Sequence, residues 1–264
     1  MYTAKDYVTV SHLGEAMRLL KADPQNAIIA GGMMMRLGKA EYHTLIDLSG
    51  LGLDQVTMSG EHISIGAMAT LRQVEQDPVL RSHADGVLPR SVSPIIGTQF
   101  RNMATIGASV YGRYAFSDPI TALLALDAEI RFYEGGKMPL GTYLTGRPRR
   151  DILISIEIPL DDRRASYQTH RLTTTDFGVL DVCCARKTDG SYRLAIGSRP
   201  SVAARARNAE NLLRDGDTEG ALKSIQQELM YGSNLRGSAE YRKTLATVLT
   251  RRALSEISEG GASL

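Results

Sequence analysis

Two short glycine-containing turns have the residue types best suited to hold an anion. The first, Ala30-Gly31-Gly32, ends the apolar run 27–30, and the second is Thr105-Ile106-Gly107-Ala108-Ser109. Glycine lets backbone amides approach an anion without an intervening side chain, and the N-terminus of a following helix adds favourable polarity. Two such turns converging on one diphosphate would cradle it, although each turn alone is more often structural. Neither turn has GxGxxG or P-loop spacing, so Rossmann and Walker sites are excluded.

A carboxylate follows the second turn and precedes an apolar helical stretch. Asp118, in Phe116-Ser117-Asp118-Pro119, can accept hydrogen bonds from sugar or ribityl hydroxyls. The alternative, a helix N-cap, fits the same position equally well. The five histidines show neither metal-ligand spacing nor a catalytic triad, so we predict no metal site and no catalytic residue.

Three successive units must position these turns. Helical spacing of apolar residues over 13–20, between short strands at 27–30 and 44–48, predicts an α/β unit. A second unit contains a hairpin turning at Ser59-Gly60, a helix capped by Thr70 and a strand at 151–159. In the third unit we expect a three-stranded antiparallel sheet followed by helices, with strands at 166–171, 179–186 and 192–197 and helices at 201–214, 218–229 and 238–258. The fold class is therefore α+β.

Composition excludes several classes of protein. The formal charge of +2, spread over 264 residues, does not suggest nucleic-acid binding, and no apolar run is long enough for a membrane helix. The two cysteines, Cys183 and Cys184, would point to opposite faces of a strand as buried thiols. Without a CxxC motif the chain cannot hold its own iron–sulfur cluster, and we expect a cytoplasmic location.

Five stretches, in order, resemble the FAD-binding subunit of the xanthine dehydrogenase and carbon monoxide dehydrogenase family, the molybdenum hydroxylases. They are AGGMMM at 30–35, QFRNMATIGAS with its spacing to FSDP, DILISIEIP at 151–159, RLTTTDFGVLDV at 171–182 and LRGSAEYRKTLATVLTRRAL at 235–254. The resemblance covers essentially the whole chain. It implies a two-part FAD-binding domain of the vanillyl-alcohol-oxidase type at 1–162, with subdomains of about 1–50 and 51–162, and an α+β C-terminal domain at 163–264.

The resemblance also implies the chemistry. In such enzymes a molybdenum subunit hydroxylates the substrate, and electrons pass through [2Fe–2S] clusters on a small subunit to FAD. The flavin then passes them to NAD or another acceptor. This chain would hold only the FAD, and its partners would be the iron–sulfur small subunit and the molybdenum-binding large subunit.

By position, the resemblance implies these cofactor contacts. The diphosphate would lie against Ile29, Ala30, Gly31, Gly32, Met33, Met34, Met35, Thr105, Ile106, Gly107, Ala108 and Ser109, with the amide of Gly107 close to a phosphate oxygen. Asp118 would bind a cofactor hydroxyl and Leu153 would touch the ring. Ile95 would line the adenine or ring pocket, and Asp176 and Phe177 would approach the flavin from the third unit.

Some positions depart from the family pattern, and two other functions stay open. Met33-Met34-Met35 stands where Thr, Ser or Asp is usual, and Ala108 and Ser109 replace a glycine and a polar residue. A lysine often found before the RxxxxxDF stretch, which begins at Arg171, is absent, with Gln168 and His170 nearby. The two alternatives to an electron-transfer subunit are a non-catalytic interaction subunit that keeps the fold but has lost FAD, and a free-standing flavoprotein oxidase.

Overall fold

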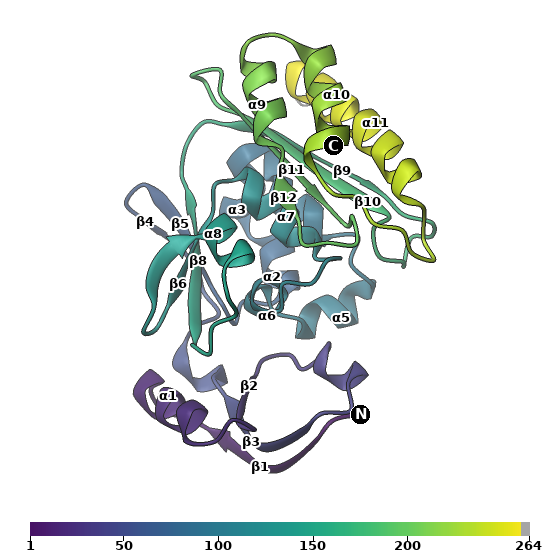
Figure 1. Cartoon of the computed structure of the whole chain (residues 1–264). Coiled ribbons are helices and arrows are strands. Elements are labelled where there is room, and N and C mark those ends of the chain that lie inside the picture. The colour runs from purple at the N-terminus through teal and green to yellow at the C-terminus, as the bar shows by residue number, and fades with distance from the viewer. Residues whose placement is uncertain (260–264) are drawn as a thin grey trace.

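The computed structural model describes residues 1–259, and three sheets follow one another along this part of the chain (Figure 1). The strand orders are β1-β3-β2, β4-β5-β8-β6-β7 and β12-β11-β10-β9. The strands are β1 (Thr3–Thr9), β2 (Ala27–Ile29), β3 (Glu41–Asp47), β4 (Val56–Ser59), β5 (His62–Gly66), β6 (Glu129–Phe132), β7 (Gly136–Pro139), β8 (Leu153–Pro159), β9 (Arg164–His170), β10 (Leu180–Arg186), β11 (Tyr192–Gly197) and β12 (Ala204–Arg205).

The helices lie between these strands and over the last sheet. The α-helices are α1 (Leu13–Ala22), α2 (Leu71–Gln76), α3 (Pro78–Ser82), α4 (Val87–Val92), α5 (Gly97–Met103), α6 (Ile106–Tyr111), α7 (Asp118–Ala125), α8 (Leu140–Thr145), α9 (Arg207–Arg214), α10 (Thr218–Glu228) and α11 (Ala239–Ser258). Short 3-10 turns are η1 (Met35–Leu37), η2 (Ser49–Leu51) and η3 (His83–Gly86). Within residues 1–259, no helix combines the length and apolarity that crossing a membrane requires.

The N-terminal sheet is parallel, and helix α1 packs on it. Ala16, Met17 and Leu20 of α1 are buried against Ile46 of β3, which is the apolar stripe that the helical spacing predicted. Strand β1 pairs with β3 but was not predicted. Its residues are almost all exposed, so β1 lacks the alternation of apolar and polar residues that would indicate a half-buried strand.

The five-stranded sheet is antiparallel, and its first hairpin is the predicted one, although Ser59 still pairs with His62 and the turn is formed by Gly60 and Glu61, one residue later than predicted. Helix α2 begins at a capping box in which the Thr70 hydroxyl accepts a hydrogen bond from the amide of Gln73. The Gln73 side chain in turn accepts from the amide of Thr70. Local capping chemistry therefore fixes where α2 begins, as the sequence indicated.

Helix α7 lies against the C-terminal sheet, and all eight of its residues are buried. Cys183 of β10 belongs to the core that contains α7, whereas Cys184 belongs to the core formed with α9, α10 and α11. Both cysteines are free and buried, which confirms the expectation for neighbouring residues in a strand. The C-terminal sheet is thus covered by helices on both faces.

This sheet has four strands, not the three predicted. The two residues of β12 pair with Ala195 and Ile196 of β11. A strand of two residues is too short to show a period, so the helix predicted at 201–214 covers it. Helix α9 accordingly begins at Arg207 and not near residue 201.

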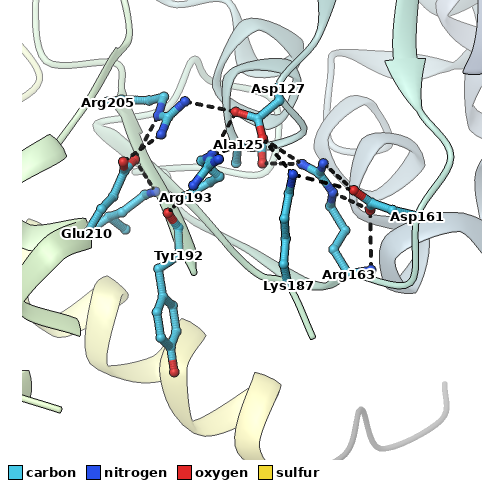
Figure 2. A network of polar contacts seen from close by, with 10 residues as sticks. Ala125, Asp127, Asp161, Arg163, Lys187, Tyr192, Arg193, Arg205 and Glu210 are labelled. Carbon is cyan, nitrogen blue, oxygen red and sulfur yellow. Dashed lines mark hydrogen bonds and ion pairs between the residues drawn. The ribbon is translucent and has the colours of Figure 1, made fainter. Parts of the chain in front are cut away.

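A network of ion pairs joins the residue that follows α7 to the C-terminal sheet (Figure 2). The Asp127 carboxylate accepts hydrogen bonds from Arg193 and Arg205, each at 2.8 Å. Arg163 and Lys187 each place a nitrogen 3.5 Å from the same carboxylate. Asp127 therefore connects the end of the buried helix to the linker, to the β10–β11 hairpin and to β12.

Candidate cofactor site

A cavity of about 660 Å³ is lined by residues from all three parts of the chain. Its size is that of a cofactor site. The predicted site residues that line it are Ala30, Gly31, Gly32, Met33, Met34, Met35, Ile95, Thr105, Gly107, Ala108, Ser109, Asp118, Leu153, Asp176 and Phe177. Ile29 and Ile106 do not belong to its lining: Ile29 lies in β2, and Ile106 is completely buried in α6.

The first glycine turn lies directly against the segment that leads into the second. A Cβ atom on Gly31 would lie 1.6 Å from the carbonyl oxygen of Met103, so this approach requires glycine. The backbone amides of residues 31–34 donate to no other described residue. A short stretch of unpaired N–H groups at the cavity wall can receive the oxygens of an anion, as helix N-termini and amide nests do.

The second turn is organised differently from the first. The amides of Ile106 and Gly107 each donate at 2.9 Å to a carbonyl oxygen, those of Ala69 and Ala67 respectively. The amide of Ala108 donates to the Thr105 hydroxyl at 3.2 Å. The expectation that the Gly107 amide approaches a phosphate oxygen is therefore wrong, because that amide is already occupied.

Gly107 is needed for packing. A Cβ atom there would lie 2.3 Å from the carbonyl oxygen of Ala67. Ala108 lies within α6, and its φ is not positive, so its methyl group causes no backbone strain. The Ser109 hydroxyl donates to the carbonyl oxygen of Thr105 at 3.1 Å. The departures from the family pattern at Ala108 and Ser109 thus fit the local helix.

Asp118 is the first residue of α7, and Ser117 is the N-cap. The interpretation of Asp118 as a cap is therefore wrong. One carboxylate oxygen of Asp118, Oδ1, accepts a hydrogen bond from the Tyr167 hydroxyl at 2.9 Å and another from Arg171. Burial raises the pKa of Asp118 to about 8, and the nearby Asp181 acts in the same direction, against Arg171 and Tyr167.

Arg171 was missed in the sequence, although it lines the cavity. Its Nη1 donates to the carbonyl oxygen of Asp176 at 2.6 Å, and its buried Nε has no partner among the described residues. An unpaired buried donor costs free energy, so this N–H has capacity for a ligand oxygen. Arg171 could not be recognised from the sequence because its carboxylate partner, Asp118, lies 53 residues away along the chain.

Three aromatic rings form one wall of the cavity. The centroid of the Phe177 ring lies 4.3 Å from that of Phe116. The Phe116 ring in turn stacks on Tyr114, with 5.2 Å between the two centroids. Phe177 follows Asp176, whose Oδ1 accepts from Arg236 at 2.9 Å. The Asp176 carboxylate is thus engaged within the protein, and its neighbour Phe177 contributes an apolar surface suited to a planar ring.

Comparison with known proteins agrees with this geometry. Residues 2–161 match the family described as the FAD binding domain in molybdopterin dehydrogenase, and residues 166–257 match the CO dehydrogenase flavoprotein C-terminal domain. The chain belongs to this family of FAD-binding oxidoreductase components. The family confirms both the predicted resemblance and the predicted cofactor, FAD.

Full-length relatives support the same assignment. The nicotine 6-hydroxylase medium subunit of Paenarthrobacter nicotinovorans is 27% identical, with 95% of this chain and 96% of the relative covered. The putative xanthine dehydrogenase FAD-binding subunit XdhB of Escherichia coli K12 is 24% identical, with 97% of each covered.

Solved structures show the same fold. A chain of carbon monoxide dehydrogenase from Hydrogenophaga pseudoflava superposes with a TM-score of 0.86 at 21% identity, covering 96% of this chain and 97% of that one. A chain of quinoline 2-oxidoreductase from Pseudomonas putida 86 superposes with a TM-score of 0.84 at 22% identity, covering 98% and 97%. The predicted fold, a two-part FAD-binding domain followed by an α+β domain, is confirmed.

Proposed function

We propose that the FAD of this family member binds in the cavity described above, with its diphosphate against the amides of residues 31–34. The observation that carries this proposal is a row of backbone amides, those of residues 31–34, that donate to no other described residue. They begin at Gly31, which lies directly against Met103. An extended dinucleotide needs anion donors beside a large apolar wall, and the cavity offers both. The cavity residues predicted from the sequence remain the proposed contacts, with Arg171, Tyr114 and Phe116 added.

The other cavity residues would orient the rest of the cofactor. Asp118 Oδ2, which receives no hydrogen bond from a described residue, would pair with a sugar or ribityl hydroxyl. Leu153, Ile95 and the three aromatic rings would exclude water from the planar portions. When bound, FAD supplies reversible acceptance of electrons, which no side chain of the cavity can provide.

In the complete enzyme, this chain would act as the electron-transfer subunit. We infer that it receives electrons from [2Fe–2S] clusters on a small subunit and that a large subunit holds the molybdenum cofactor. NAD or another acceptor would then receive the electrons that bound FAD supplies. Support comes from relatives named as medium or FAD-binding subunits, and the free thiols of Cys183 and Cys184 suit a cytoplasmic enzyme. We also propose residues 1–162 and 163–264 as the two domains.

The two other functions would be recognised by different features. An interaction subunit without FAD would not need an open cavity with unpaired amides, so the cavity favours a cofactor-binding chain. Among the described residues that line the cavity there is no histidine or cysteine that could attach flavin covalently. We therefore expect FAD to be bound non-covalently, one molecule per chain.

The visible spectrum of the purified full chain tests the proposal. We expect flavin bands, a ratio of FAD to protein near one, and complete release of the flavin on denaturation. A chain that stays colourless after incubation with FAD would contradict the proposal. Flavin that remains on the polypeptide after denaturation would contradict the non-covalent part alone.

Co-expression with an iron–sulfur and a molybdenum subunit should yield one complex, and a chain that purifies alone under those conditions would contradict the proposed partners.

A further inference from the structure

A second buried carboxylate lies behind the wall of the cavity. Asp181 of β10 is completely buried, and its two oxygens accept hydrogen bonds from Thr169, at 2.5 Å, and from Ser198. The backbone closes over it at Gly178, where a Cβ atom would lie 2.5 Å from an Asp181 oxygen. Asp181 does not line the cavity and has no part in the proposed contacts to FAD.

Asp118 and Asp181 belong to one cluster that contains a single positive charge. Arg171 bonds to Asp118 and acts electrostatically on both carboxylates, and Tyr167 of β9 interacts with both. The two side chains that donate hydrogen bonds to Asp181, those of Thr169 in β9 and Ser198 after β11, are uncharged. If both carboxylates were ionised, one negative charge would be buried without compensation.

A single proton removes that imbalance. Two carboxylates that share a buried site cannot both ionise at their usual pH, because each disfavours the charge of the other. Burial, the largest cause for both residues, raises the pKa of Asp181 and raises that of Asp118 to about 8. The cluster is therefore neutral when two carboxylates, one guanidinium and one bound proton are present.

We propose that Asp118 and Asp181 hold one proton between them, and that the redox state of the flavin controls the affinity of the pair for this proton. The inference rests on the proposed function, because it needs FAD in the cavity that Asp118 lines. Two-electron reduction of bound flavin by the iron–sulfur partner would place negative charge in the cavity. A carboxylate oxygen of the pair then binds a proton from solvent water, and no bond within the chain breaks.

The direction of the effect follows from the charge. Negative charge on the reduced cofactor raises the proton affinity of Asp118 and Asp181. These two carboxylates therefore lose their shared proton at a higher pH in the reduced protein than in the oxidised protein. Below about pH 8 both forms keep the proton. Above that pH, reduction should take up about one additional proton per two electrons. The midpoint potential should then fall more steeply with pH, by about 30 mV per pH unit.

Redox titration of the full chain loaded with FAD, between about pH 6 and about pH 9, tests this. We expect the additional slope above about pH 8 in the parent and its loss in Asp181→Asn, because Arg171 alone then compensates Asp118 in both redox states. The matched control is Asp161→Asn, which removes a carboxylate outside the cavity and should keep the parental slope. Equal slopes in the parent and Asp181→Asn, with FAD bound in both, would overturn the inference.

A measurement on the parent protein covers the case in which Asp181→Asn fails to fold. The reduced-minus-oxidised infrared spectrum above about pH 8 should gain the carbonyl stretch of a protonated carboxylic acid. Absence of that band overturns the inference while leaving FAD binding intact. A parent chain that binds no FAD would instead overturn the proposed function and this inference with it.

Discussion

One carboxylate oxygen of Asp118 accepts hydrogen bonds from Tyr167 and Arg171, whereas the second accepts none from a described residue and is the proposed partner of a cofactor hydroxyl. We expect Asp118→Ala to weaken FAD binding by about 10- to 150-fold, which corresponds to the loss of one hydrogen bond to a charged or polarised group. It also leaves the buried Arg171 without its partner, so the melting temperature should fall. Asp118→Asn should keep the fold and lie between the parent and Asp118→Ala in affinity. FAD titrations of the folded fraction measure this, and an Asp118→Ala dissociation constant within about twofold of the parent would remove Asp118 from the site.

Substitution of Gly107 is expected to affect stability and not FAD affinity. Because its Cα packs against the carbonyl oxygen of Ala67, Gly107→Val should lower stability by roughly 1–3 kcal/mol or more through overpacking. Flavin content should fall in proportion to the folded fraction. The control Ala108→Gly lies one position away and should cost only about 1 kcal/mol through helix propensity. Thermal melts run beside flavin assays decide the matter, and a Gly107→Val chain with unchanged melting temperature but no flavin would restore the phosphate role.

At this scale, the sequence predicts residue types better than it predicts roles. Gly31 and Gly107 stand out because each follows an apolar or helical signal, and both line the cavity. The Gly107 amide is engaged by Ala67, and the space at Gly31 is limited by Met103, and both of these neighbours lie far from the glycine in sequence. A single sequence does not contain that pairing, and the same reason hides the contact of Arg171 with Asp118.

At the scale of elements, long-range ion pairs fix how α7 meets the C-terminal sheet. Removal of the charge in Asp127→Asn leaves four cations with less compensation (Figure 2). The side chain of Asp127 is 22% exposed, so we expect a loss of about 2 kcal/mol, not the cost of a fully buried pair. Urea unfolding should show this with an unchanged m-value. The control Asp189→Asn, on the exposed hairpin, should change stability little, and equal effects would contradict the role of the network.

Elements were predictable where the signal is local. The cap at Thr70, the β4–β5 hairpin and the strand β8 follow from capping, turn and alternation rules. Strands β1 and β12 were missed because each is specified by its neighbour: β1 by the parallel strand β3, and β12 by β11. The residues of β1 are almost all exposed, and β12 has only two residues, so neither strand shows an alternation of apolar and polar residues.

At the scale of the whole molecule, the cavity is the place where the N-terminal turn, the middle unit and the loop after β9 meet. Gly31, Leu153 and Phe177 line it from these three parts. A cofactor that contacts all three would act as an additional link between segments far apart in sequence. Binding to the folded chain and not to the unfolded chain then stabilises the entire protein.

FAD added to the flavin-free chain should therefore raise its melting temperature. At a free concentration of about 100 times the dissociation constant, the gain is about 2.7 kcal/mol. For a chain of this size, that corresponds to roughly 5–11 °C. AMP, which carries the adenine and one phosphate but no flavin ring, should shift the melting temperature less, because it cannot reach the aromatic wall at Phe177 and the amides of residues 31–34 together. Hydrogen exchange should slow at those amides with FAD, since they have no partner among the described residues. Equal shifts with AMP and FAD, or exchange at residues 31–34 that FAD leaves unchanged, would show that the diphosphate lies elsewhere.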